Sequence, residues 1–150
     1  MKLIALIAII VSTLTLSGVS QAKAEEKANY KEKIFKKRIM VVKAAKKMLG
    51  VPYIFGGESK RGLDCSGLTR IVYKAVNILL PHFAASQMHL GKWVRQKFLR
   101  PGDLLFYYDG GHVALYIGNG KMIHASSSYG RVVNAPLRTG WTQARRIIHY

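Results

Sequence analysis

Apolar residues recur at helical spacing in two segments of the chain, and short strand-like segments follow after residue 100. The spacing predicts one helix over residues 31–49, which Gly50 ends as a C-terminal cap, and a second helix that runs from Ser66 and stops before Pro81. The apolar stripes consist of Ile34, Val41, Val42, Ala45, Met48 and Leu49 in the first helix and Leu68, Ile71, Val72, Ala75, Ile78 and Leu79 in the second.

The rest of the chain predicts loops and a sheet. Residues 51–62 contain Pro52 and several glycines and form a loop, and residues 81–101 form an irregular connection with a short helix at 84–90. Strands are predicted over 104–108, 112–117, 122–125 and 145–150, where β-branched and aromatic residues are frequent. Helices followed by an antiparallel sheet indicate an α+β fold.

The N-terminus has the three parts of a secretory signal peptide: Lys2, an apolar run over residues 3–16, and the cleavage pattern Ala22-Lys23-Ala24. The run is shorter than the ~20 residues that span a bilayer, so the membrane is engaged only transiently. We therefore expect a signal peptide at 1–24, a mobile charged leader at 25–33 and one domain at 34–150, exported to the periplasm or to the extracellular cell wall.

The charge is strongly unbalanced, with 24 basic against 7 acidic side chains and a formal net charge of +17. Removal of the signal peptide takes away two lysines and leaves the excess in place. Such a charge implies an anionic partner. The export signal argues against nucleic acid, and the basic residues of 27–47 lack the interleaved aromatics that stack on bases. These residues are either a solvated helix face or a surface that binds anionic cell-wall polymers.

The chain has a single cysteine, Cys65, at the start of the second predicted helix. One thiol cannot form an intramolecular disulfide, so Cys65 is either a nucleophile or a small buried apolar residue. No paired cysteines or histidines occur at the spacing of a zinc site, and we expect neither a metal nor another cofactor.

His112 and His124 are the candidate partners of the thiol, and they can cooperate only on one face of a hairpin. A two-residue turn at Asn119-Gly120 would place them on opposite faces. A three-residue loop, with Gly120 left-handed in a bulge, would place them on the same face. The apolar residues favour the second register, in which the predicted pairs are Ile117 with Lys121, Ala114 with His124 and His112 with Ser126.

In that register the three side chains can carry out nucleophilic catalysis. The helix N-terminus and a nearby imidazolium would lower the pKa of the Cys65 thiol. His112 would take the thiol proton and pass it to a leaving amine, and His124 would hold the imidazole of His112 in the productive tautomer.

Four sequence motifs, and the order in which they follow one another, resemble those of the NlpC-type cell-wall peptidases, which are papain-like cysteine peptidases. The resemblance covers residues 39–148. The motifs are Leu49-Gly50-Val51-Pro52-Tyr53-Ile54-Phe55-Gly56-Gly57, Leu63-Asp64-Cys65-Ser66-Gly67-Leu68, Arg100-Pro101-Gly102-Asp103-Leu104-Leu105-Phe106, and His112 to Gly120 with Ile123-His124-Ala125-Ser126.

The resemblance implies a papain-like fold, with the nucleophile at a helix N-terminus packed on an antiparallel sheet. It implies Cys65 as nucleophile, His112 as base and His124 as orienting residue. It also implies that Tyr53 helps to stabilise the oxyanion and that Asp64 and Ser66 line the substrate cleft. Asp64 is alternatively, or additionally, the N-cap of the helix.

Members of the family hydrolyse amide bonds in peptidoglycan stem peptides, either between D-glutamate and the diamino acid or at the cross-link between stems. The resemblance therefore implies an exported peptidoglycan endopeptidase, which we expect to be a monomer. A non-catalytic wall-binding module of the same fold, an acyltransferase and an antibacterial toxin are the alternatives. Many members carry an arginine after Leu80-Pro81, where this chain has His82, so substrate preference transfers less directly than the chemistry.

Overall fold

The computed structural model describes the backbone of residues 2–149 and the side chains of residues 18–149. The chain divides into two compact units, one ending at Phe35 and the other comprising Lys36–His149. The first helix, α1 (Lys2–Lys46), contains the described residues of the first unit and continues into the second. No helix among the described residues is both long and apolar enough to cross a membrane.

The charged leader predicted at residues 25–33 is helical and exposed instead. These residues are mostly Ala, Glu and Lys, which have high helix propensity, and neither Gly nor Pro interrupts them. Because these residues have no apolar stripe, the helix is exposed along this segment, but it remains helical. Of the signal peptide predicted at 1–24, Met1 and the side chains up to residue 17 lie outside the described part.

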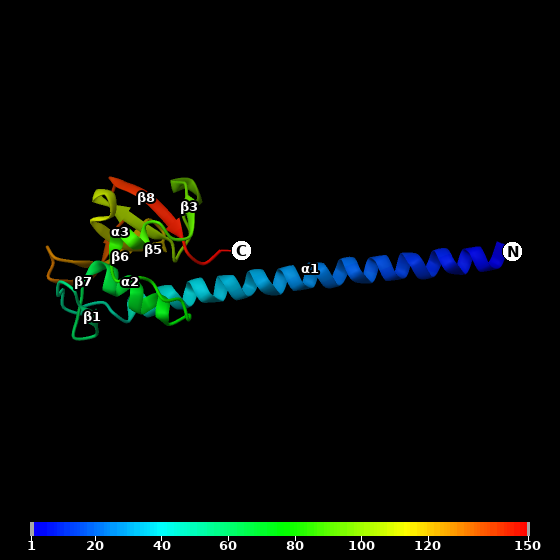
Figure 1. The fold of residues 1–150 in the computed structure, drawn as a ribbon, viewed down its shortest axis with the longest axis horizontal. Coiled ribbons are helices and arrows are strands. Elements are labelled where there is room, and N and C mark those ends of the chain that lie inside the picture. The colour runs from blue at the N-terminus through cyan, green and yellow to red at the C-terminus, as the bar shows by residue number, and fades with distance from the viewer. Residues whose placement is uncertain (1, 150) are drawn as a thin grey trace. The chain divides into compact units, whose positions relative to one another are not determined.

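The second unit is built on an antiparallel sheet, part of which is labelled in Figure 1. Its six strands have the order β3-β8-β4-β5-β6-β7. A separate two-stranded sheet joins β1 to β2 in the loop before Cys65. The strands are β1 (Glu58–Ser59), β2 (Gly62–Leu63), β3 (Lys92–Val94), β4 (Leu104–Tyr107), β5 (His112–Gly118), β6 (Lys121–Ser126), β7 (Arg131–Pro136) and β8 (Trp141–Arg146).

The predicted α+β class is confirmed, and four strands were not predicted: β1 and β2 of the small sheet and β3 and β7 of the large one. Strand β7 hydrogen-bonds along the whole of β6. Its neighbours Gly130 and Gly140 both have positive φ, which marks the turns that bound this segment. The last strand was predicted at residues 145–150 but runs over Trp141–Arg146, and Tyr150 lies outside the described residues.

Two longer helices and several short ones accompany the sheet. The C-terminal turns of α1 bury the predicted residues Val41, Val42 and Ala45, and Met48 is buried just after the helix, whereas Leu49 is exposed. Helix α2 (Cys65–Lys74) packs against β5 and β6. The short helices are α3 (Ala84–Gln87) and the 3₁₀ turns η1 (Gln96–Phe98) and η2 (Tyr108–Gly110).

Helix α2 ends earlier than the prediction. The carbonyl of Tyr73 accepts hydrogen bonds from the backbone amides of Val76 and Ile78, and Asn77 adopts a positive φ of 61°. The resulting turn reverses the burial of the residues that follow. Leu79, predicted to be buried, is 69% exposed, while Leu80 is buried.

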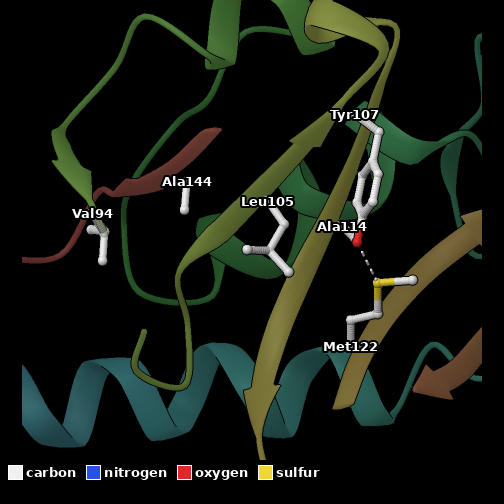
Figure 2. Packing of buried hydrophobic residues seen from close by; sticks show 6 residues of the cluster. All are labelled: Val94, Leu105, Tyr107, Ala114, Met122 and Ala144. Atoms are coloured by element: carbon white, nitrogen blue, oxygen red, sulfur yellow. Dashed lines mark hydrogen bonds between the residues drawn. The ribbon is translucent and has the colours of Figure 1, made fainter. Parts of the chain in front are cut away.

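Both faces of the central strands are covered by apolar side chains. The predicted core residues Val113, Leu115, Ile123 and Ala125 are fully buried on one face. On the other face, which also carries the two histidines, a second cluster surrounds Tyr107, whose hydroxyl donates a hydrogen bond to the sulfur of Met122 at 3.3 Å (Figure 2). The cluster consists of Val94, Leu105, Tyr107, Ala114, Met122 and Ala144.

A buried carboxylate explains the Arg-Pro-Gly-Asp motif before β4. Asp103 is fully buried and accepts hydrogen bonds from the Arg38 guanidinium at 3.1 Å, from Arg146 at 2.8 and 2.9 Å, and from the backbone amide of Arg100. Arg38 lies near the end of α1 and Arg146 ends β8, so one carboxylate connects both elements to the start of β4. A buried charge is tolerated here because two cations pair with it.

The β5–β6 hairpin combines features of the two predicted alternatives. Leu115 pairs with Ile123 and Tyr116 with Met122, which is the predicted register. The loop prediction is wrong: the tight turn has only two residues, Asn119 and Gly120, both with positive φ, and Lys121 pairs with Gly118 instead of Ile117.

A bulge between Tyr116 and Gly118 reconciles the short turn with the predicted register. Two consecutive left-handed residues are typical of a type I′ turn, which an Asn-Gly pair favours. Gly118 has a φ of 93°, a conformation that is accessible to glycine. The extra residue shifts the pairing by one position, so His112 and His124 lie on the same face.

Candidate active site

Cys65 is the first residue of α2, and Asp64 is its N-cap. The carboxylate of Asp64 accepts hydrogen bonds from the Gly67 amide at 2.7 Å, from the Ser66 hydroxyl at 3.0 Å and from the Gly56 amide at 2.9 Å. The capping role expected of Asp64 is therefore observed. Because the carboxylate also bonds the loop at Gly56, it fixes both the helix start and the segment that precedes it.

The glycine after Ser66 is required by a close backbone approach. A side chain at Gly67 would overlap the carbonyl oxygen of Gly57. The same carbonyl accepts a hydrogen bond from the amide of Asp64 at 3.0 Å. The glycine-rich loop and the start of α2 therefore pack backbone to backbone, which positions Cys65 next to the loop that carries Tyr53.

Ser66, which was expected to line the substrate cleft, has a role inside the helix start. Its side chain is buried, and its hydroxyl donates to Asp64. Its carbonyl accepts hydrogen bonds from the Thr69 hydroxyl at 2.9 Å and from the Gln87 side chain at 3.1 Å. Ser66 therefore stabilises the first turn of α2 from the inside.

The two histidines meet on adjacent strands. His112 begins β5 and His124 lies within β6, and the Nε2 atom of His112 is 3.0 Å from the Nδ1 atom of His124. Their rings are nearly perpendicular, at 85°. When His112 Nε2–H donates this hydrogen bond, the Nδ1 atom of His112 keeps its lone pair and can accept a proton.

Both imidazoles are held in the neutral form. Burial lowers the pKa of His112, and the positive charge of Arg138 lowers it further. Burial, His112 and Arg138 together lower the pKa of His124 to about 4. At neutral pH the pair therefore carries no charge, and His112 is available as a proton acceptor.

The thiol lies beside the start of β5. Burial raises the pKa of Cys65, and the negative charge of Asp64 raises it further, whereas hydrogen bonds from the backbone amides of Val113, Ser66 and Cys65 lower it. Val113 directly follows His112, so the amide that reaches the thiol belongs to the residue next to the first histidine. The expectation that the helix N-terminus would produce a net lowering of the thiol pKa is wrong, because burial outweighs the amides.

Tyr53 is half-buried in the loop before α2, and its backbone amide donates to the carbonyl of Gly130 at 2.8 Å. Burial raises the pKa of its phenol, and the charges of Cys65 and Asp64 raise it further. The phenol is therefore close enough to sense a thiolate and remains protonated. A neutral hydroxyl can donate a hydrogen bond to a developing oxyanion.

The sequence indicated His82 as a departure from the family pattern but not its contacts, and Tyr107 and Arg138 were missed. His82 replaces the expected arginine, and its Nε2 atom lies 3.1 Å from Asp64 Oδ1. Its Nδ1 atom lies 3.4 Å from Glu58 Oε2. Its place after Leu80-Pro81 was the available signal. Tyr107 and Arg138 belong to no motif, and only the fold brings them to the histidines.

A pocket of about 140 Å³ opens beside the histidine pair. His112, His124, Tyr107, Tyr108 and Arg138 contribute to its lining, together with the serines of the β6–β7 turn. In the part of the chain that the structure describes, no three His, Cys, Asp or Glu side chains converge in a way that could hold a metal ion.

Comparisons with known proteins place the chain in a family. Residues 50–149 match the NlpC/P60 family. The chain is similar to the peptidoglycan endopeptidase RipB of Mycobacterium tuberculosis, with 36% identity over 156 residues that cover 93% of this chain and 61% of RipB. It is also similar to the γ-D-glutamyl-L-lysine dipeptidyl-peptidase of Bacillus cereus, with 40% identity over 105 residues covering 66% of this chain and 32% of the relative.

Solved structures support the same assignment. The structure of RipB superposes with a TM-score of 0.73 at 37% identity and covers 78% of this chain and 67% of that one. The P60 domain of the Mycobacterium avium subspecies paratuberculosis antigen MAP1204 gives the same TM-score at 36% identity and covers 78% of this chain and 98% of that domain. This chain belongs to the NlpC/P60 family.

Proposed function

We propose that this protein is a cysteine peptidase that hydrolyses amide bonds in the stem peptides of peptidoglycan. The observation that carries the proposal is the His112–His124 contact of 3.0 Å at the end of the strand whose Val113 amide reaches the Cys65 thiol. A thiol, a neutral base and an orienting group are the components of nucleophilic acyl transfer. The names of RipB and the B. cereus relative support peptidoglycan as the substrate.

The reaction begins from neutral partners. His112 takes the thiol proton at Nδ1 as the sulfur attacks the substrate carbonyl carbon. Its Nε2–H donates to His124 Nδ1, so the neighbouring ring stabilises the imidazolium that forms. The Tyr53 hydroxyl and the backbone amide of Cys65 are the donors that we assign to the oxyanion.

The leaving amine departs when the tetrahedral intermediate collapses. The carbon–nitrogen bond breaks, His112 returns its proton to the amine, and the acyl group remains on Cys65 as a thioester. Water then attacks the thioester carbonyl while His112 takes a proton from it. The carbon–sulfur bond breaks, and the proton returns to the thiolate, which restores the free enzyme.

We propose the amide between D-glutamate and the diamino acid as the bond that is cleaved, rather than the cross-link between stems. The name of the B. cereus relative supports this choice. Digestion of defined muropeptides, with products identified by mass spectrometry, tests it. The proposal predicts release of the dipeptide that ends in D-glutamate, and products cut only at the cross-link would contradict it. No hydrolysis of either bond would favour a non-catalytic module.

We further propose that the protein is exported and is held at the wall by its basic N-terminal helix. Residues 25–33 are exposed along α1 and include the lysines Lys27, Lys31 and Lys33. A mature N-terminus at Glu25 would support cleavage of the predicted signal peptide. Electrostatic retention on purified cell wall should weaken as salt rises, since the Debye length shortens to ~3 Å at 1 M. Retention that is independent of salt would contradict the role of the helix.

A further inference from the structure

The pocket beside the histidines lies on the side of the site that should receive the leaving group. His112 and His124 line it, whereas Cys65 and Tyr53 do not. The acyl half of the substrate must lie over the thiol and the oxyanion donors. The leaving amine must lie within hydrogen-bonding reach of His112, which protonates it. The residue that carries this amine therefore extends over the histidines towards the pocket.

The electrostatics of the pocket are those of an anion site. Arg138 contributes to the lining and is exposed to solvent, and its charge acts on both histidines. None of the side chains that line the pocket is acidic. The serines Ser126, Ser127 and Ser128 supply hydroxyl donors around the same space. A guanidinium with nearby hydroxyls matches the bidentate geometry of a carboxylate.

The backbone around Arg138 is held in place on both sides. The Tyr107 hydroxyl shares its single hydrogen between the Met122 sulfur and the Arg138 carbonyl, each 3.3 Å away. The amide of the preceding residue, Leu137, donates to the Gly120 carbonyl at 2.7 Å. Tyr107 also packs against His112, with ring centroids 6.1 Å apart. The Tyr107 side chain therefore contacts His112 and also holds the backbone of Arg138. Because that backbone is already fixed, substrate binding loses less conformational entropy.

We propose that Arg138 binds a carboxylate on the leaving-group half of the substrate, so that the enzyme prefers stem peptides whose diamino acid carries a free side-chain carboxylate. This inference rests on the proposed function and goes beyond it, because it assigns a specificity residue and a charge to the leaving group. The favoured substrate is then a diamino dicarboxylic acid stem. Lysine stems and stems with that carboxylate amidated are the disfavoured substrates.

Two matched tetrapeptide stems test the preference. One contains a diamino dicarboxylic acid with its side-chain carboxylate free, and the other is identical except that this carboxylate is a carboxamide. The α-carboxylate is in a peptide bond in both, so only one charge differs. We expect kcat/KM of the native enzyme to favour the carboxylate by roughly tenfold or more, the value of one charge-assisted contact.

Substitution of the arginine should remove the preference. Arg138→Gln is expected to lower kcat/KM for the carboxylate stem to the level of the carboxamide stem, and Arg138→Lys to retain part of the preference. Arg95→Gln, an exposed arginine next to the edge strand β3, is the charge-matched control and should preserve the full ratio. An equal loss on both stems, or an unchanged ratio, in Arg138→Gln would overturn the inference.

A second readout does not depend on turnover. Because the Arg138 charge lowers the pKa of both histidines, Arg138→Gln should raise both pKa values in an NMR titration. Unchanged values would place the guanidinium away from the pair and overturn the inference. Equal cleavage of the two stems by the native enzyme would refute the inference and leave the proposed function standing. Cleavage of neither stem would contradict the proposed function, and the inference would fall with it.

Discussion

His112 Nε2 and His124 Nδ1 lie 3.0 Å apart, with the two rings nearly perpendicular. Burial lowers the pKa of both imidazoles, so one neutral ring orients another. A neutral imidazole stabilises an imidazolium less than a carboxylate does, but it brings no second charge into a buried site. The contact therefore favours a base that is uncharged at rest and becomes charged only when the thiol proton arrives.

Loss of the second ring should reduce catalysis rather than substrate binding. His124→Ala removes the acceptor for His112 Nε2–H, so the tautomer and the orientation of the base are no longer fixed. We expect kcat on a defined muropeptide to fall by roughly 10- to 100-fold, the range typical of lost orienting partners, with little change in KM. His124→Gln keeps an amide oxygen as acceptor and should recover part of the loss. A KM effect without a kcat effect would contradict the orienting role.

The lowered pKa of His112 predicts an acid-tolerant enzyme. The neutral base is present above its pKa and is lost as the pH falls through it. Because burial, and secondarily Arg138, lower that pKa, kcat/KM should hold down to a pH below the usual histidine range of about 6.5. Arg138→Gln should move the acid limb to higher pH. The pH profile of kcat/KM checks both, and an acid limb above the usual range in the native enzyme would contradict the neutral pair.

Asp64 should control the ionisation of the nucleophile separately from capping the helix. Burial raises the pKa of Cys65, and the Asp64 carboxylate adds to this effect. Asp64→Asn keeps a side chain that can cap α2 but removes the charge. The alkylation rate of Cys65 by iodoacetamide should then rise with pH through a lower pKa than in the native protein.

Asp64→Ala is the matched comparison, since it removes both charge and cap. It should lower the free energy of unfolding by about 1 kcal/mol or more, because the bonds to the Gly67 and Gly56 amides are lost as well. If Asp64→Asn left the alkylation profile unchanged, the carboxylate would have no electrostatic influence on the thiol.

The elements of the site could be predicted from the sequence wherever a local pattern determined them. The apolar pattern placed Leu115 opposite Ile123 and put both histidines on one face, against the Asn-Gly signal for a short turn. Both signals were correct, because a bulge absorbs the difference. The bulge adds one residue to β5 and forms only in the folded sheet. The spacing of residues in the sequence therefore does not show whether a short turn is followed by a bulge.

Features that depend on distant parts of the chain could not be predicted. Arg138 lies between β7 and β8 and reaches the histidines only because the β6–β7 pairing and the Tyr107 hydroxyl bring it there. The pKa of Cys65 is raised because surrounding elements bury the thiol. This burial could not be predicted from the residues at the start of the helix. Helix α2 was predicted too long because an apolar stripe continues through the turn at Asn77.

The most direct test of the central claim is digestion of purified peptidoglycan by the native protein and by the Cys65→Ala variant, with the soluble stem fragments measured by mass spectrometry. Alanine removes the sulfur and leaves the Asp64 cap in place, so the fold should be retained, as circular dichroism can verify. We predict that the native protein releases stem fragments and that the variant releases none above background. Equal release by the folded variant would show that Cys65 is not the nucleophile.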